Sequence, residues 1–141
     1  MMIGDGPEKV NAEKLARKLG IKNKIVFFGN SNETNKILSF SDLFLLPSEI
    51  ESFGLSALEA MAARVPVVSS NTGGIPEVNI DNFSGLLSDI GDIKKMIEDS
   101  LHILSNDNIH NKFKTNARNR AKDFDIHNIV PMYESIYNSL T

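Results

Sequence analysis

The stretch LFLLPSEIESFGLSALEAMAARVPVVSS, residues 43–70, alternates between two kinds of secondary-structure signal. An apolar, β-prone run stops at Pro47, a mixed segment follows, and a second apolar run occupies residues 66–69. This order predicts a buried strand, a helix and another buried strand, which is the repeating unit of a parallel sheet. Ser52 is suited to an N-cap, so we expect the helix to span residues 53 to about 63.

The flanking sequence continues the same alternation. Two further runs are β-prone, at residues 25–28 and 83–87, and the first is expected to be a buried strand that ends at Gly29. Helical patterns cover residues 7–20, 32–40, 93–104, 108–124 and 127–140. Residues 73–77 are expected to form a turn that opens a short helix. The expected fold class is therefore α/β: a Rossmann-like parallel sheet with helices on both faces.

Length and composition exclude several classes of function. The chain has 141 residues, a formal net charge of -3 and no cysteine. The length suits one domain, and the absence of cysteine excludes disulfides and thiolate chemistry. The net negative charge argues against a nucleic-acid partner. We expect a cytoplasmic location, at most peripheral to a membrane. A basic run within residues 112–122 is compatible with an acidic lipid surface or RNA, but a solvated helix face is its more common meaning.

The chain starts abruptly. Only three residues, Met1 to Ile3, precede the turn Gly4-Asp5-Gly6-Pro7, and typical strands run about five or six residues. We therefore expect the sequence to begin inside a strand of a larger protein, truncated at its N-terminus. A short edge strand at a natural start is the alternative.

Three loops are expected at the carboxyl ends of strands, where parallel α/β sheets bind ligands. They are Gly29-Asn30, residues 48–54 and residues 70–74. The middle loop leads into the predicted helix, whose first amide groups lack partners inside the helix and favour an anion. Gly54 has no side chain, so a diphosphate can approach the amides of Phe53, Gly54 and Leu55.

Two glutamates flank this helix start. Carboxylates only accept hydrogen bonds, so Glu51 suits the hydroxyls of a sugar and Glu59, two turns into the helix, suits a second diol such as a ribose. One helix would then hold a sugar, a diphosphate and a ribose. The plainer interpretation also stands: acidic residues near a helix start complement the helix dipole, and Glu59 is then an exposed helix residue.

The residues around the pair resemble glycosyltransferase family 4, whose members have the GT-B fold. Glu51 and Glu59 match the family's E-x7-E motif, and four further segments fit in order. These are Gly4-Asp-Gly-Pro-Glu8, Asp42-Leu-Phe-Leu-Leu-Pro-Ser48, Pro66-Val-Val68 and Gly73-Gly-Ile-Pro-Glu77. The resemblance runs in register to about residue 90. Within the family, residues 45–54 are most similar to members that transfer N-acetylglucosamine from UDP-GlcNAc to L-malate.

The resemblance implies roles for individual residues. Glu51 would contact the donor sugar as a catalytic residue that positions and stabilises, without forming a covalent bond. Ser52, Phe53, Gly54 and Leu55 would serve the sugar and diphosphate of a nucleoside diphosphate sugar. Glu59 would hold the ribose, and Gly29 and Asn30 would lie by the base. Transfer would retain the anomeric configuration and need neither a metal nor another cofactor.

The resemblance also implies a division of labour. Residues 1–141 would form the donor-binding domain, and helix 125–141 would pack toward a missing N-terminal acceptor domain. This fragment alone would then be inactive, and a bare face of the last helix would favour a homodimer. Two alternatives remain: a stand-alone module that binds a nucleotide or nucleotide sugar, and an interaction domain with a decayed site.

The sequence departs from the family pattern in two ways. The family supplies an arginine and a lysine to the diphosphate from a segment before Gly4, which this sequence does not contain. The family also tends to have glycine where Arg64 stands. A left-handed arginine at that helix end would cost roughly 1 kcal/mol, unless the helix ends differently.

Overall fold

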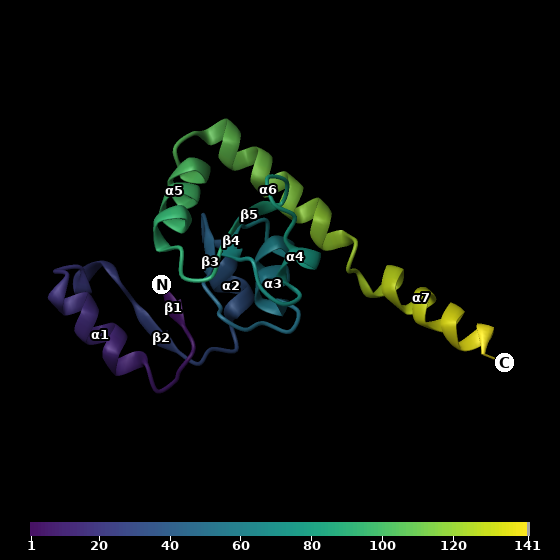
Figure 1. Ribbon diagram of the computed structural model, residues 1–141, viewed down its shortest axis with the longest axis horizontal. Helices are drawn as coiled ribbons and strands as arrows, with labels where there is room; N and C mark the ends of the chain where they lie inside the picture. Colours follow the sequence, from purple (N-terminus) through teal and green to yellow (C-terminus); the bar gives the residue numbers. More distant parts are fainter. Residues whose placement is uncertain (141) are drawn as a thin grey trace. The chain divides into compact units, whose positions relative to one another are not determined.

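The computed structural model describes residues 1–140 and divides into two compact units, residues 1–36 and residues 37 onward (Figure 1). The first unit holds two parallel strands, β1 (Met2–Ile3) and β2 (Phe27–Gly29), with helix α1 (Lys9–Lys18) and a 3-10 turn, η1 (Lys22–Lys24). The run at 25–28 was expected to be buried, but Val26 and Phe28 are about half exposed, at 53% and 51%. The unit is small, so it offers few side chains to cover its strands.

The second unit is built on a three-stranded parallel sheet in the order β3-β4-β5. Its strands are β3 (Phe44–Leu46), β4 (Val67–Ser70) and β5 (Gly85–Ser88). Its helices are α3 (Leu55–Ala62), α4 (Ile75–Val78), α5 (Ile93–Leu104), α6 (Asp107–Lys122) and α7 (Ile126–Ser139), with α2 (Thr34–Ser39) at the boundary between the units. The predicted parallel α/β class is confirmed, although the strands form two separate hydrogen-bonded sheets.

Strand β4 separates the core of the second unit into two faces. Consecutive strand residues point to opposite faces of a sheet. Val67 accordingly packs in a cluster with the buried residues of α3, whereas Val68 packs with Leu86 of β5 and Ile103 of α5. Helix α6 contributes to both clusters. The sheet is thus covered on both faces, as the uninterrupted apolar strands predict.

A buried polar network ties α4 to the sheet. The side-chain amide of Asn79, which is fully buried, donates to Ser69 Oγ at 3.0 Å, and its oxygen accepts from Ser84 Oγ at 3.1 Å. The Ser84 hydroxyl in turn accepts from the Ile80 amide at 2.8 Å. Because each partner is removed from water, these bonds fix the end of α4 beneath β4 and β5.

Replacing Asn79 with alanine is expected to lower the free energy of unfolding by about 2–4 kcal/mol, because two buried hydroxyls lose partners and a cavity remains. Urea unfolding measures the change. Asn11→Ala, at an exposed position of α1, is the matched control and is expected to stay within about 0.5 kcal/mol of the parent. A loss of less than about 1 kcal/mol for Asn79→Ala would show that the network adds little.

Arg64 ends helix α3 in a left-handed conformation, with φ 66°. The Val65 amide donates to Ala60 O at 2.9 Å and the Arg64 amide to Met61 O at 3.0 Å, the paired bonds of a Schellman cap. Val65 and Ala60 also share the apolar cluster, which is the hydrophobic contact of this motif. The strain anticipated for an arginine at this position is therefore present.

Replacing Arg64 with glycine is expected to stabilise the protein by about 0.5–1 kcal/mol. The substitution removes about 1–2 kcal/mol of left-handed strain, partly offset by a freer unfolded chain, worth about 0.4–1 kcal/mol. Urea unfolding of Arg64→Gly and Arg64→Ala separates strain from side-chain effects, since alanine keeps the strain and should give no gain. If the glycine variant is the less stable of the two, the strain argument is wrong.

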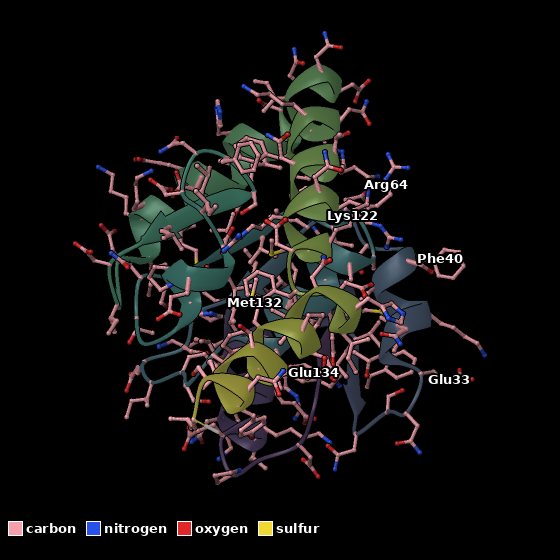
Figure 2. All side chains as sticks on the ribbon, turned by 90° about the vertical axis from the view of Figure 1, so that its right-hand side faces the viewer. Glu33, Phe40, Arg64, Lys122, Met132 and Glu134 are labelled. Atoms are coloured by element: carbon pink, nitrogen blue, oxygen red, sulfur yellow. The ribbon has the colours of Figure 1, made fainter. Side chains whose placement is uncertain are left out.

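Helix α7 carries a largely exposed apolar set. Ile126, Met132, Tyr133, Ile136, Tyr137 and Leu140 each have more than half of their surface exposed. Figure 2 looks toward this helix and labels Met132 and Glu134 on it. None of the helices in residues 1–140 has both the length and the apolar character that crossing a membrane requires.

Candidate functional site

The parallel register brings the carboxyl ends of the three strands of the second unit to one edge. Leu46 pairs with Ser69, and Ser70 pairs with Ser88. Beyond the strands, the Asn71 amide donates to Ser88 O at 2.7 Å. The loops that follow β3 and β4 therefore leave the sheet side by side, as expected for a ligand-binding edge.

The loop of residues 47–54, called the 47–54 loop below, packs backbone against backbone on the turn at residues 71–74. The Gly74 amide donates to Glu51 O at 3.3 Å, and Thr72 Oγ1 donates to Glu49 O at 3.2 Å. A Cβ atom on Gly73 would lie 1.7 Å from Glu51 O, and one on Gly74 would lie 2.5 Å from Ser52 O. The two glycines are therefore required by the close approach of the loop and the turn.

Helix α3 begins later than the sequence predicted. Its N-cap is Gly54, with φ 93°, and not Ser52, and its first residue is Leu55. Glycine is itself an accepted N-cap, and only a residue without Cβ adopts this φ at little cost. The first helical bond runs from the Leu58 amide to Gly54 O at 3.0 Å.

This shift changes which amide groups are free for an anion. The amides of Leu55, Ser56 and Ala57 precede the first helical donor, so they have no acceptor within α3. The sequence had assigned Phe53, Gly54 and Leu55. Of these, only Leu55 belongs to the first turn, where it is exposed; Ser56 follows at a partly buried position, and Ala57 is fully buried, so its amide is closed to a ligand.

The two glutamates lie on either side of this helix start. Glu51 is half-buried in the 47–54 loop, three residues before the N-cap. Glu59 is exposed on α3, one turn beyond Leu55, on the side of the helix away from the buried residues Ala57, Ala60 and Met61. The expected order along the chain, carboxylate, free amides and second carboxylate, is therefore present in the second unit.

Gly29 and Asn30 belong to the other unit. Gly29 ends β2 with φ 68°, and Asn30 follows it. Gly29 and Asn30 lie in the first compact unit and the glutamates lie in the second. The expected place of Gly29 and Asn30 beside a nucleotide base stays a prediction.

Two surface hollows lie at the opposite end of α3. One is lined by Ala62, Ala63, Arg64, Thr115, Arg118 and Asn119, and the other by Ser39, Ser41, Ala63, Arg64, Asn111 and Lys114. Figure 2 labels Arg64 at the surface there. Both hollows are a helix length away from Gly54, so neither supports the donor-site assignment.

The side chain at the end of β5, Ser88, is hydrogen-bonded to the carboxylate of Asp99 and is not free for a ligand. Ser88 donates to the buried Asp99 carboxylate at 3.3 Å, and the Lys95 ammonium also hydrogen-bonds to that carboxylate. The hydrogen bond that the Lys95 ammonium donates to Asp99 raises the pKa of Lys95 above its ordinary value. Asp92 is the N-cap of α5, and its side chain accepts from the Lys95 amide at 2.9 Å.

Comparison with known proteins identifies the class. The family model described as glycosyl transferases group 1 matches residues 1–120, so the chain belongs to that family. The fold is that of GT-B glycosyltransferases. A solved structure of sucrose-phosphate synthase from Thermosynechococcus elongatus superimposes with a TM-score of 0.87 at 25% identity, over 98% of this chain and 37% of that one.

Two curated relatives are similar in sequence. The chain is 37% identical to N-acetyl-alpha-D-glucosaminyl L-malate synthase of Bacillus anthracis over 97% of its own length and 36% of the relative's. It is 30% identical to 2-deoxystreptamine N-acetyl-D-glucosaminyltransferase of Niallia circulans over 99% of its own length and again 36% of the relative's. The chain thus spans about a third of the curated relatives it matches.

Proposed function

We propose that this chain is the donor-binding part of a retaining glycosyltransferase that uses a nucleoside diphosphate sugar. The observation that carries the proposal is the start of α3, where the free amides of Leu55 and Ser56 stand between Glu51 and Glu59 along the chain. The diphosphate would accept hydrogen bonds from these amides and gain from the helix dipole. Glu51 would accept bonds from the sugar hydroxyls and Glu59 from the ribose.

The transferred sugar is proposed to be N-acetylglucosamine, carried by UDP, with L-malate as acceptor. The support is the malate synthase relative, together with a second relative that is also an N-acetylglucosaminyltransferase. The family membership by itself supports sugar transfer without naming donor or acceptor.

The reaction would proceed without a protein nucleophile. The acceptor hydroxyl would attack the anomeric carbon from the face that the diphosphate leaves, the bond from that carbon to the phosphate oxygen would break, and the hydroxyl proton would pass to the departing phosphate. The chain's own contribution would be to hold the donor and to stabilise charge on the leaving group. We propose that the missing arginine and lysine, from a segment before Gly4, complete that stabilisation.

The exposed apolar residues of α7 are proposed to contact the acceptor-binding domain of the same protein, as expected for residues 125–141. An unpartnered apolar face of this kind marks an interface. A homodimer through α7 is the alternative. Sedimentation of the intact protein distinguishes the two proposals. A monomer in which α7 is buried supports contact with the acceptor-binding domain. A dimer that Tyr133→Glu dissociates supports the homodimer.

Calorimetry with UDP and GDP tests the proposed donor site. Binding of UDP by the chain, weaker than by the intact protein, is the expected result. No heat with either nucleotide would support the alternative of an interaction domain with a decayed site. Nucleotide binding by an intact protein that transfers no sugar from UDP-GlcNAc would instead favour the stand-alone binding module.

A further inference from the structure

The end of α6 is linked to the 47–54 loop through Arg120, in its last turn, and the ring of Phe124, which follows the helix. Each nitrogen of the Arg120 guanidinium has a partner: Nε donates to Val78 O at 3.3 Å, Nη2 donates to Glu77 O, and Nη1 pairs with Asp123 at 2.9 Å. Glu77 and Val78 are the last residues of α4, so Arg120 caps carbonyl groups at the end of that helix. In Figure 1 the α6 ribbon passes close to α4.

The same guanidinium stacks on Phe124, with Arg120 Cζ 4.7 Å from the centre of the ring. Phe124 in turn meets Phe53 edge to face, with ring centres 5.8 Å apart and an interplanar angle of 79°. Phe53 directly precedes Gly54, the N-cap of α3. Arg120 and Phe124, together with Phe53, form what we call the α6 brace.

The brace reaches the helix start by a second route as well. Gly74 packs its backbone on Phe53 Cα, and the side chain of Ile75 lies against Gly54. Ile75 is the first residue of α4, the helix whose last carbonyls Arg120 binds. The corner at residues 53–54 is therefore held through Phe124 on one side and through α4 on the other.

We propose that Arg120 and Phe124 are positioning residues for donor binding, a proposal that rests on the proposed function. They act through other residues: the Phe124 ring packs on Phe53, and Arg120 binds the last carbonyls of α4, whose first residue lies against Gly54. Through these contacts they set the direction in which the amides of Leu55 and Ser56 point. Phe124 also lies two residues before α7 begins at Ile126, so its packing on Phe53 fixes the chain just ahead of that helix.

Arg118 provides a matched control within α6. Two residues before Arg120, its guanidinium also donates to a backbone carbonyl at the end of a helix, Ala62 O of α3. That carbonyl lies at the end of α3 remote from Gly54. Arg118→Met and Arg120→Met thus remove the same type of interaction, but only Arg120 is linked, through Phe124 and α4, to the corner that presents the amides.

The first test is nucleotide affinity. UDP binding is measured by calorimetry, on the intact protein, at a temperature where every variant is folded. Arg120→Met and Phe124→Leu are each expected to weaken UDP binding about 10-fold. Phe124→Tyr, which keeps the ring, is expected to bind UDP as the parent does. The UDP affinity of Arg118→Met is expected to stay within about twofold of the parent's. Parent-like affinity of Arg120→Met would overturn the proposal.

The second test needs no ligand and separates failure of the brace from failure of the proposed function. Hydrogen exchange of the Leu58 amide, which donates to Gly54 O, reports directly on the helix start. Exchange in Arg120→Met is expected to be at least about 10-fold faster than in Arg118→Met at matched stability. Equal exchange in both refutes the brace, whereas faster exchange with no UDP binding by the parent protein refutes the donor assignment alone.

Discussion

Replacing Gly73 with alanine is expected to weaken UDP binding by about 100-fold, because the added Cβ would lie 1.7 Å from Glu51 O and must displace the 47–54 loop. No relaxation of a flexible side chain relieves this collision, since the Cβ is fixed to its own backbone and its partner, Glu51 O, is a backbone atom. The loop would have to move away from the 71–74 turn, breaking the bond from the Gly74 amide to Glu51 O. Calorimetry with UDP on the intact protein measures the change.

Gly91 supplies the control for Gly73. It also has a positive φ, 79°, but a Cβ there would meet nothing within 4 Å. Alanine at either position costs about 1–2 kcal/mol of left-handed strain. Only Gly73→Ala adds the collision with Glu51 O to that strain. Gly91→Ala should lose stability and keep the parent's affinity for UDP. Equal affinities of the two variants would show that the 71–74 turn does not support the binding loop.

The two glutamates are expected to respond differently to different ligands. Glu59→Gln should weaken binding of UDP and UDP-GlcNAc alike, by about 10- to 100-fold, because a hydrogen bond to a charged group is worth about 1.5–3 kcal/mol. Glu51→Gln should weaken UDP-GlcNAc by a similar factor and leave UDP nearly unchanged, since only the nucleotide sugar carries the hydroxyls that Glu51 is proposed to hold. Calorimetry with both ligands gives all four affinities.

Glu98→Gln is the matched control for this pair. Glu98 lies on α5 and its only ion pair recorded in residues 1–140 is the exposed one with Lys94 at 3.8 Å, which contributes little. Its affinities should equal those of the parent. If Glu51→Gln weakens UDP as strongly as UDP-GlcNAc, the assignment of Glu51 to the sugar is wrong, even if the site itself is correct.

The parallel α/β fold could be predicted because its signals are local. Apolar runs such as residues 66–69 require burial on both faces of a strand, and Val67 and Val68 do enter opposite clusters. For Arg64 the sequence left two outcomes open, a left-handed helix end or a different end of the helix, and the structure has the first.

The start of α3 was predicted less well, because N-cap preference does not separate Ser52 from Gly54. The serine is the more usual cap, but Gly74 and Phe124 hold residues 52–53 in a corner, so the helix starts at Leu55. That outcome depends on tertiary contacts with residues far along the chain. The α6 brace was missed for the same reason: Arg120 was counted in a basic run, and nothing local shows that it caps α4.

The most direct test of the donor site is a titration of the chain with UDP, followed through the backbone amide resonances of residues 37–140. The account predicts that the largest shifts fall on Leu55 and Ser56, and that Glu59→Gln reduces them at a given UDP concentration. Shifts that concentrate instead around Arg64 and Lys114, at the other end of α3, would contradict it.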